Sequence, residues 1–457
     1  MEQNSRYDRI DRVAGVNDGY KNFTVDVLVD DNEVELYTIQ VMLIVTVNIL
    51  AKWCKSVNIN APNANCKILK YSNQTLHEVL TSIASNSTLS SFTINEITES
   101  TNNILVIGKS KPDMYDNAVW ADCSGWVAGF GKGDKKNRLE RSIDDNNYLA
   151  ASFAASLASA ELFRIATGNS RGNIERWFSL LDLSVSDTPM LLQNNFAFPT
   201  KLDLGRIYQF GCGAVGSTLI YLLGLSEWKA ELHGVDFDIV KEQNLSSSLL
   251  FSKDNAKNKD KKVDACYSFV DDTNIKFYSH DKDAKEFLSY QEGKKESADI
   301  FLCLANERKV WLDVQYSMPP LTYHATTTKS WGVNFGRHIP IKEWCLICRF
   351  KDEVNHVMVP TCSEGVIGNS DNGEEILGML PFLPPIASVI LLADIFKINS
   401  GLVSEFNYAE FSLRNQTNGI IKLPRVPDPC YVCRDFTEAV YPEKVKESKY
   451  WKIVTNA

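Results

Sequence analysis

The chain from Arg206 onward alternates short apolar runs with stretches of helix length. The short runs are IYQF, ELHGVDFDIV, NIKFYSH, ADIFLCL and PLTYHA, and the longer apolar stretch AVGSTLIYLLGL follows the first of them. Strands that alternate with helices are typical of βαβ units and a parallel sheet. We therefore predict an α/β, Rossmann-like domain with a mainly parallel sheet over residues 204–457.

The first half has a less regular pattern but contains three clear apolar segments. The run VMLIVTVNIL, from Val41 to Leu50, is about half the ~20 residues that a membrane span needs, so we expect a buried element. ILVIGK at 104–109 predicts a buried strand. The alanine-rich stretch at 146–168 predicts a packed helix that ends at a Gly168 cap. We expect a separate domain over residues 1–175 and a connector over 176–203.

Length, charge and cysteine content narrow the class of protein. A chain of 457 residues exceeds the ~250–300 residues at which single cores stop growing, so we expect at least two domains. The net charge of -9 argues against nonspecific electrostatic binding to nucleic acid or to an anionic membrane. The first residues contain no apolar signal-peptide core, and we expect a cytoplasmic protein. Eleven cysteines in such a chain indicate thiol chemistry or metal rather than disulfides.

A glycine-rich loop follows the first strand of the second half, in the stretch FGCGAVGST. Gly211 would permit the turn, Gly213 would let the backbone approach a phosphate, and Gly216 would let the following helix pack closely. The N-terminus of that helix offers N–H groups and the positive end of a dipole. The loop predicts a nucleotide site, although dehydrogenases that use NAD share this pattern.

Polar residues after the next strand make the nucleotide site more specific. Asp236, in VDFD, stands about 20 residues beyond the last glycine, where an acid can accept hydrogen bonds from ribose hydroxyls. Asp238 and Asn244 follow it in DFDIVKEQNL. Lys262 would suit a triphosphate, because the charge at the α-phosphate under attack must be neutralised.

Two CxxC pairs lie far apart in the chain. CLIC contains Cys345 and Cys348, and CYVC contains Cys430 and Cys433. Each pair can supply two thiolates to one tetrahedral zinc ion. We predict a structural zinc site that joins two distant segments.

These motifs, in this order, resemble the ThiF/MoeB/E1 family, whose members adenylate the C-terminus of ubiquitin-like proteins. The resemblance covers about residues 204–436, and its strongest piece is CLICRFKDEVNHVMVPTCSEGVIG. It implies ATP with Mg²⁺ as the nucleotide and metal of the reaction. It also places Cys362 where some family members form a covalent bond to the ubiquitin-like partner.

The N-terminal stretch RYDRIDR is similar to the family's RYxRQ opening, whose second arginine reaches ATP in the other subunit of a dimer. That position is Arg9 in this chain. The resemblance therefore implies that residues 1–175 are a degenerate, inactive adenylation-like domain that supplies Arg9 to the active half. The alternative arrangement is a homodimer, in which Arg9 would reach the active site of the other chain.

Two positions depart from the family pattern. The arginine of the family's NLxR motif falls on Ser247, and the acid that helps to hold magnesium falls on Ala305. Asp236 or Asp238 could position the metal instead, and Arg9 or Arg308 could supply the charge.

The resemblance implies an E1-like enzyme that adenylates a ubiquitin-like protein, forms a thioester on Cys362 and passes the acyl group to an E2-like protein. The chain leaves little space for the large catalytic-cysteine insertion of eukaryotic E1 enzymes. It looks most like the E1 of bacterial ubiquitin-like conjugation systems, such as the Bil antiphage type.

Three other functions stay open from the sequence. A sulfur-carrier adenylyltransferase of the ThiF/MoeB type would use the same chemistry, but such proteins are typically single-domain homodimers. An NAD-dependent dehydrogenase would share the glycine loop and Asp236, but it gives no reason for Lys262 or the CxxC pairs. A non-catalytic pseudo-E1 scaffold is favoured by Ser247 and Ala305.

Overall fold

The computed structural model describes most of the chain. The described residues are 4–13, 15–86, 90–96, 102–108, 118–137, 139, 145–170, 172–328, 330–343, 345–349, 368–369, 375–376, 378–413, 421–423 and 430–456.

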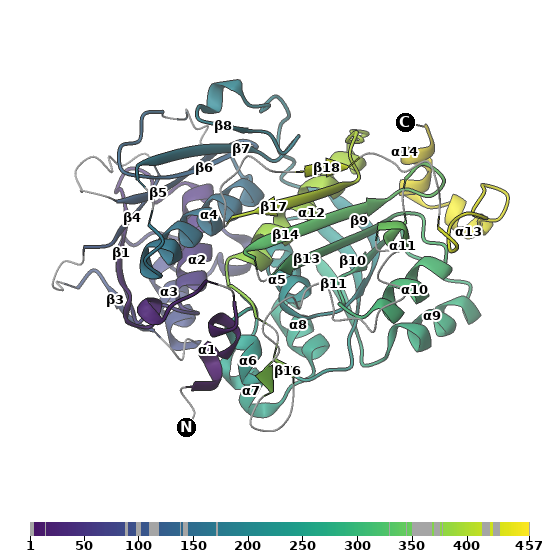
Figure 1. Ribbon diagram of the computed structural model, residues 1–457, viewed down its shortest axis with the longest axis horizontal. Helices are drawn as coiled ribbons and strands as arrows, with labels where there is room; N and C mark the ends of the chain where they lie inside the picture. The colour runs from purple at the N-terminus through teal and green to yellow at the C-terminus, as the bar shows by residue number, and fades with distance from the viewer. Residues whose placement is uncertain are drawn as a thin grey trace.

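The described residues form two large sheets side by side (Figure 1). The first sheet has the order β3-β2-β1-β4-β5-β6-β7-β8 and the second has the order β11-β10-β9-β12-β13-β14-β17-β18. The first sheet contains β1 (Thr24–Val29), β2 (Ser56–Asn60), β3 (Ser91–Ile94), β4 (Ile104–Ile107), β5 (Val119–Ser124), β6 (Val127–Lys132), β7 (Ile174–Ser179) and β8 (Val185–Ser186). The second contains β9 (Asp203–Phe210), β10 (Lys229–Val235), β11 (Ile275–His280), β12 (Ile300–Cys303), β13 (Thr322–Thr328), β14 (Gly332–His338), β17 (Tyr408–Ser412) and β18 (Ile421–Leu423). A separate hairpin pairs β15 (Gly368–Asn369) with β16 (Glu375–Ile376).

The two sheets repeat one topology. When the strands of each sheet are renumbered from one in chain order, both read 3-2-1-4-5-6-7-8. The strands of positions 1 to 5 pair in parallel in both sheets, and positions 6 to 8 extend each sheet with antiparallel pairs. The predicted α/β, Rossmann-like fold is therefore confirmed.

Helices connect and cover the strands of both sheets. They are α1 (Asn4–Asp11), α2 (Tyr37–Leu50), α3 (Leu76–Asn86), α4 (Tyr148–Ala166), α5 (Ala214–Gly224), α6 (Glu242–Leu245), α7 (Lys253–Asn258), α8 (Lys262–Val270), α9 (Ala284–Gly293), α10 (Arg308–Tyr316), α11 (Leu346–Arg349), α12 (Leu383–Asn399), α13 (Glu443–Lys446) and α14 (Lys449–Asn456). The apolar run at 41–50 forms most of α2. The stretch at 146–168 forms α4, and Gly168 follows the helix with a φ of +72°, as expected for a glycine that ends a helix.

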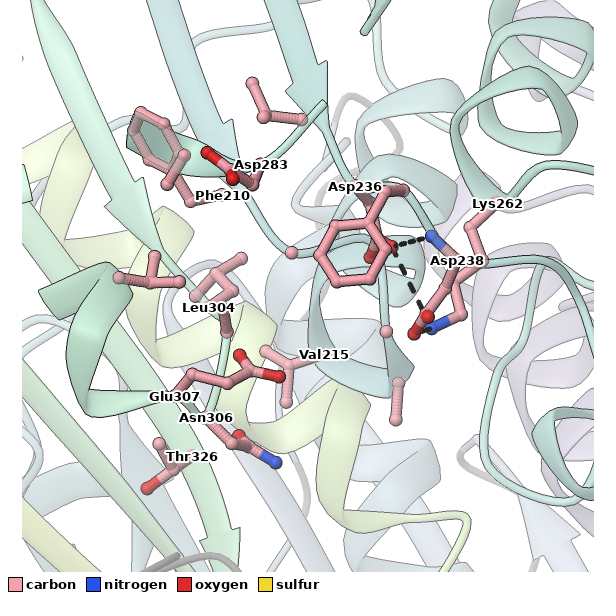
Figure 2. A pocket seen from close by; sticks show the side chains of 18 of the residues that line it. Phe210, Val215, Asp236, Asp238, Lys262, Asp283, Leu304, Asn306, Glu307 and Thr326 are labelled. Carbon is pink, nitrogen blue, oxygen red and sulfur yellow. Dashed lines mark hydrogen bonds and ion pairs between the residues drawn. The ribbon is translucent and has the colours of Figure 1, made fainter. Parts of the chain in front are cut away.

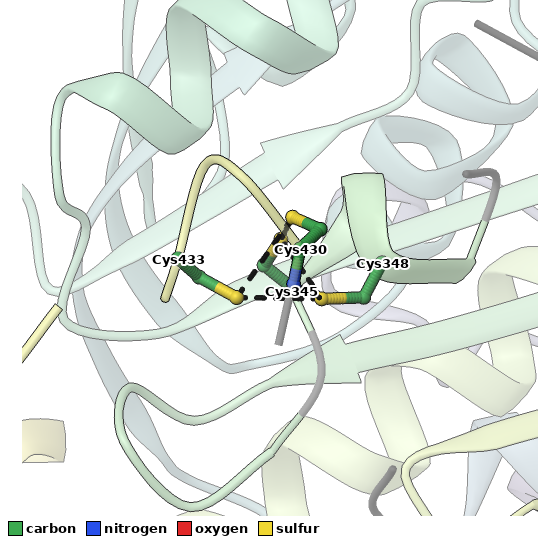
Figure 3. A group of neighbouring side chains, drawn as sticks. All are labelled: Cys345, Cys348, Cys430 and Cys433. Atoms are coloured by element: carbon green, nitrogen blue, oxygen red, sulfur yellow. Dashed lines mark hydrogen bonds between the residues drawn. The ribbon is translucent and has the colours of Figure 1, made fainter. Parts of the chain in front are cut away.

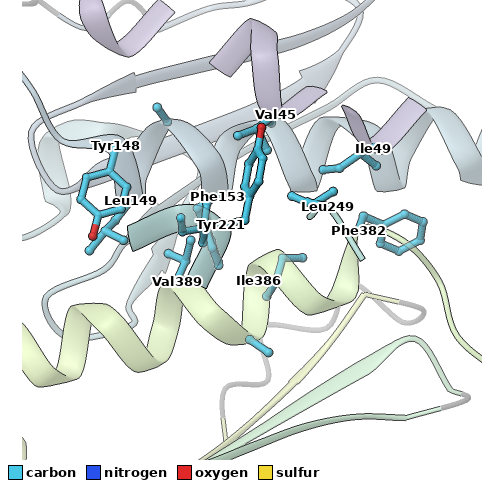
Figure 4. Close-up of a cluster of buried hydrophobic side chains, with 14 of the residues drawn as sticks. Val45, Ile49, Tyr148, Leu149, Phe153, Tyr221, Leu249, Phe382, Ile386 and Val389 are labelled. Atoms are coloured by element: carbon cyan, nitrogen blue, oxygen red, sulfur yellow. The ribbon is translucent and has the colours of Figure 1, made fainter. Parts of the chain in front are cut away.

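The core runs continuously between the two halves. Helix α4 packs against both α2 and α12, and α12 packs against α5. Side chains from these helices interdigitate, including Phe153 of α4 and Val389 of α12 (Figure 4). Trp126 of the first half stacks on Phe396 of α12 with ring centroids 4.4 Å apart. The halves therefore share one apolar interior, and neither buries its helices alone.

Helices α2 and α4 are mostly apolar and have no exposed polar stripe, as suits helices that lie inside this shared core. All residues of α2 after Tyr37 are buried, which is the environment in which a helix has no polar stripe. Helix α4 is long and apolar enough to cross a membrane, but 94% of that window is buried inside the protein. Burial in the shared core therefore accounts for the apolar composition of α4.

Strands β7 and β8 lie in the segment around 176–203 that the sequence suggests is a connector. They pair antiparallel to β6 and to each other at the edge of the first sheet. The first sheet thus extends to Ser186, and the chain enters the second sheet at Asp203.

Candidate functional site

A cavity of about 480 Å³ opens at the carboxyl ends of β9, β10 and β12 (Figure 2). In an open parallel sheet this edge, where the strand order reverses, is the usual place for a ligand. Seven residues predicted from the sequence line the cavity together: Arg9, Gly211, Gly213, Asp236, Asp238, Asn244 and Lys262.

The glycine loop joins β9 to α5 and forms one wall of the cavity. Gly211 has a φ of +99°, a conformation that favours glycine. A Cβ on Gly216 would lie 2.1 Å from the Gly211 carbonyl oxygen, so glycine lets α5 start directly on the loop. A Cβ on Gly213, the N-cap of α5, would meet nothing within 4 Å. The backbone at the start of α5 is thus open to the cavity.

Asp236 ties the glycine loop to the end of β10. Its carboxylate accepts the Cys212 backbone N–H at 2.7 Å and the Asp238 backbone N–H at 2.9 Å. Burial raises the pKa of Asp236, although Lys262 and these two N–H groups act in the opposite direction. Each carboxylate oxygen has a second lone pair that a ribose hydroxyl can use.

Lys262 places a cation beside both acids. Its Nζ lies 2.6 Å from Asp238 Oδ2 and 4.0 Å from Asp236 Oδ1. Its backbone N–H also donates to the Asp238 carbonyl at 3.0 Å, which fixes the first turn of α8 against the loop after β10. Asn244 uses its side-chain oxygen to accept the Lys241 N–H at 2.8 Å at the start of α6.

Arg9 of the first half reaches this cavity within the same chain. Helix α1 packs on α6, and Arg9 Nη1 donates to Ser247 Oγ at 3.0 Å. The Met379 N–H donates to the Arg9 carbonyl at 2.8 Å, which holds the helix from the other side. Burial lowers the pKa of Arg9 to about 10, so the guanidinium stays charged at neutral pH. Ser247 stands where the family pattern has the arginine of NLxR, and it therefore has the Arg9 guanidinium beside it.

Several polar residues that the sequence did not single out also line the cavity. They are Lys282, Asp283, Asn306, Glu307, Lys309, Asp313 and Thr326. Glu307 stands two residues after Ala305, directly before α10, so a carboxylate is present on the side where the family acid is absent. Their position in the chain is the signal that could have found them. The first six follow the ends of β11 and β12, and Thr326 lies in the last part of β13. Parallel strands bring these ends to one edge of the sheet.

The equivalent edge of the first sheet is built differently. Strand β1 is followed by DDNEVEL instead of a glycine loop, and α2 begins after Leu36 without a side-chain cap. Lys135 is buried there in an ion pair with Asp122 and donates to the Gly108 carbonyl at 2.9 Å. Acidic residues stand where the other half offers glycine N–H groups, so this edge is unsuited to phosphate.

The two CxxC pairs meet in space (Figure 3). The four sulfur atoms lie within 4.8 Å of one another, and the Sγ–Sγ contacts range from 3.3 Å, for Cys348 and Cys433, to 3.9 Å, for Cys430 and Cys433. Tetrahedral coordination with Zn–S bonds of ~2.3 Å requires sulfur atoms roughly 3.8 Å apart. The cluster could hold a metal ion, and four thiolates are a typical zinc set. Cys362 lies outside the described residues.

The described residues define a Rossmann-like α/β protein with a polar cavity beside the glycine loop of the second sheet, and the first half, which has the same strand order, contributes Arg9 to it. Residues 24–180 match the model of a family described as the BilD N-terminal domain. This match agrees with the resemblance to proteins of the Bil type.

Solved structures similar to this chain include E. coli MccB with MccA and E. coli MccB with ATP. These two are 17% and 18% identical to this chain, each with a TM-score of 0.37. Each match covers 50% of this chain and 66% of MccB. A third is the microcin C7 biosynthetic enzyme MccB in complex with N-formylated MccA, at 17% identity, a TM-score of 0.37 and 50% and 67% coverage. No curated protein matches the sequence.

Proposed function

We propose that this protein is an E1-like activating enzyme that uses ATP to adenylate the C-terminal carboxylate of a ubiquitin-like protein, in a bacterial conjugation system of the Bil type. The observation that carries the proposal is the single cavity that gathers the glycine loop, Asp236, Lys262 and Arg9. The second half contributes the loop and both nearby acids. The first half contributes the arginine.

The cavity suits a nucleotide triphosphate. Its volume of about 480 Å³ falls within the ~300–1,000 Å³ of small-molecule sites. The open N-terminus of α5 offers backbone N–H groups to phosphate oxygens, and Asp236 stands at the end of the neighbouring strand, where it would accept the ribose hydroxyls. Lys262 and Arg9 supply two cations to the same cavity.

In the proposed reaction a carboxylate oxygen of the partner's last residue attacks the α-phosphorus of ATP. The new P–O bond forms as the bond from the α-phosphorus to the bridging oxygen breaks, and pyrophosphate leaves. No protein base is needed, because the carboxylate is already ionised at neutral pH. The protein's contribution is to align the two reactants and to neutralise the charge that develops on the phosphates, and Lys262 and Arg9 are placed for that task.

The donor set also fits Mg²⁺. Asp236, Asp238 and Glu307 all present carboxylates to the cavity, and Mg²⁺ is usually held by one or two carboxylates together with substrate phosphates. When bound, the ion would neutralise part of the phosphate charge.

The second step of the proposal uses Cys362. Its thiolate would attack the carbonyl carbon of the acyl adenylate, AMP would leave, and a thioester would form for transfer to an E2-like protein. This role follows from the position of Cys362 in the motif PTCSEGVIG.

Exchange of labelled pyrophosphate into ATP, with and without candidate ubiquitin-like proteins that end in glycine, tests the first step. We expect exchange that requires the partner, falls at least ~100-fold in Asp236→Ala and survives in Cys362→Ala, since the cysteine acts later. A thioester trapped with wild type but absent in Cys362→Ala would support the second step. Bound ATP without exchange with any partner would favour the pseudo-E1 scaffold instead.

The pair of Arg9 and Ser247 allows a sharper test of the first step. Arg9→Ala should lower exchange by ~10–100-fold, because a charge-assisted contact to the phosphates is lost. Adding Ser247→Arg to that variant returns a guanidinium from the position that the family uses and should recover part of the loss. An Arg9→Ala variant with unchanged exchange would remove Arg9 from the mechanism.

A further inference from the structure

Two of the four sulfur atoms in the cysteine cluster accept hydrogen bonds from the backbone. The Cys430 N–H donates to Cys348 Sγ at 3.2 Å, and the Val432 N–H donates to Cys430 Sγ at 3.4 Å. Within the described residues no N–H or O–H group donates to the sulfur of Cys345 or of Cys433, whose contacts are with the other thiols (Figure 3). The cluster therefore has donors on one half of its ligands.

Thiolates that hold a zinc ion depend on such donors. Four thiolates and one Zn²⁺ leave about two net negative charges, and hydrogen bonds from outside the ligand set spread this charge and orient the sulfur atoms. Cys345 is 1% exposed, so water has little access to its sulfur, and Cys433 is half-buried. Donors for these two ligands have to come mainly from the protein.

Tyr441 packs between the two segments that carry these two ligands. It belongs to a small apolar cluster against which Ile341 and Phe436 pack. Ile341 stands four residues before Cys345, and Phe436 stands three residues after Cys433. The rings of Tyr441 and Phe436 meet edge to face, with centroids 5.8 Å apart, and Phe436 also packs against the cysteines. Burial, and after it the nearby Cys433 and Cys345, raises the pKa of Tyr441.

The hydroxyl of Tyr441 is an unused donor. Its side chain is 2% exposed, and its oxygen makes no hydrogen bond within the described part of the chain. A buried hydroxyl in this state is rare, because it forfeits the bonds that it would make with water. The protein thus places a donor without an acceptor next to two ligands without a donor.

We propose that Tyr441 donates a hydrogen bond to the sulfur of Cys433 or Cys345 when the cluster holds its metal ion, and that this bond helps to retain the ion. The inference rests on the predicted zinc site. Neutral thiols are weak acceptors, whereas thiolates that hold a cation accept stronger, charge-assisted hydrogen bonds. Tyr441 is a positioning residue in this arrangement, because it orients a ligand and does not touch the ion.

Replacement of zinc by Co²⁺ in the full chain tests the bond itself. Co²⁺ held by thiolates has a sulfur-to-metal charge-transfer absorption band, and a hydrogen bond to sulfur raises the energy of this transition because it stabilises the sulfur lone pair. We expect the band of Tyr441→Phe to lie at longer wavelength than the band of the wild type. The variant keeps the ring and its packing, so a purely structural role of Tyr441 would leave the band unmoved.

The rate of zinc release measures how much the bond contributes. Transfer of zinc from the full chain to an excess of a coloured chelator should be at least ~10-fold faster in Tyr441→Phe, since loss of a ligand's hydrogen-bond partner typically weakens metal binding ~10–100-fold.

Tyr450→Phe is the matched control. Tyr450 is also fully buried, and its hydroxyl also makes no hydrogen bond within the described residues. The groups that act on it are Asp299 and Asp203 rather than the cysteines. This variant should match the wild type in both the band and the rate of release.

A shift of the band in Tyr441→Phe but not in Tyr450→Phe, together with faster release, is the expected result. An unmoved band in Tyr441→Phe, or the same shift in both variants, would overturn the hydrogen bond. Release at the wild-type rate would overturn its role in holding the ion. Wild-type protein that takes up neither zinc nor Co²⁺ would remove the metal site itself and the proposal with it.

Discussion

At the scale of single residues, the two halves meet through a few polar contacts that join positions far apart in the sequence. Arg9 and Ser247 are 238 positions apart yet lie within a hydrogen bond of each other. The sequence could indicate that a cation is missing at Ser247, and it could indicate Arg9 as a separate motif. Their pairing depends on the packing of α1 on α6, which no local pattern encodes.

Lys52 gives a prediction about pH. Lys52 follows α2 and is half-buried. Because this burial lowers its pKa from the ordinary 10.5 to about 8, the folded state bears the cost of the partly desolvated charge fully below pH 8. As pH rises toward 10.5 the folded state loses the proton first, and the cost disappears. Lys52→Met should therefore raise the free energy of unfolding by about 1–2 kcal/mol at pH 7 and much less at pH 10.

Guanidinium denaturation of both proteins at the two pH values measures this difference. Lys52 lines a cavity between the two halves, and among the described residues that line it the other charged side chain is Lys70, which pairs with Asp272. Neither Lys70 nor Asp272 changes in the variant. A stability gain that is equal at pH 7 and pH 10 would show that lost charge is not the cause.

At the scale of elements, two glycines of the glycine loop have different roles: Gly216 is structural, and we propose that Gly213 takes part in binding. Gly216 has no room for a side chain, whereas Gly213 faces open space. Gly216→Ala should destabilise the fold by about 1–3 kcal/mol, because the methyl group would overlap the Gly211 carbonyl. Gly213→Ala should leave the fold intact but weaken the binding of ATP, because the methyl group would occupy the space through which a phosphate approaches the backbone.

Thermal unfolding with and without ATP distinguishes the two variants. Gly216→Ala should lower the melting temperature in both conditions. Gly213→Ala should melt near the wild type without ATP and lose the shift that ATP produces. The opposite assignment of effects would contradict the proposed placement of the phosphates.

The four-cysteine cluster is the second element with a direct test. A closed set of four thiolates leaves no position for water or substrate, so a bound ion would be structural. We expect about one zinc ion per chain by mass spectrometry of the purified protein. Cys348→Ser should lose most of it and melt earlier, since metal binding contributes to folding.

Cys66→Ser is the matched control for this test. Cys66 is also buried, but it belongs to the first half and stands outside the cluster. Zinc content should stay unchanged in that variant. Two results together would contradict the zinc site: wild-type protein purified under mild conditions holds no metal, and Cys348→Ser melts at the wild-type temperature.

The elements that could be predicted from the sequence are those with strong local patterns. Helix α4 and strand β4 are long or uniformly apolar, and the strands from β9 to β13 alternate regularly with helices. Strand β7 did not stand out, because IERWFS carries Glu175 and Arg176 in its half-buried first part and is stabilised by pairing with β6. The residues of the cavity that follow β11 and β12 were missed because only the assembled sheet brings them together.

At the scale of the whole molecule, the placement of Arg9 decides how many chains a working site needs. Arg9 lines the cavity of its own chain, so a monomer should contain a complete site. Mixing Arg9→Gln with Asp236→Asn should then fail to restore pyrophosphate exchange, because each chain has one defect in its only site. Restored exchange would show that Arg9 is contributed by a second chain.

The same variants give their own control. A single chain that carries both substitutions should be as inactive as the mixture, and the specific activity of the wild type should not change on dilution. A steep loss of specific activity on dilution would indicate that an oligomer is required.

The repeated strand order of the two sheets has a consequence for the history of the chain. Two copies of one topology in tandem are what the duplication and fusion of a gene for a symmetric dimer would leave. Fusion fixes the ratio of the copies at one to one, so only one copy has to keep a phosphate loop. The other is free to drift at the edge of its sheet, where acids and a buried ion pair now stand, but not on the helices that both copies share. The ligand edges of the two sheets thus differ, while the helices of the shared core still pack the two copies against each other.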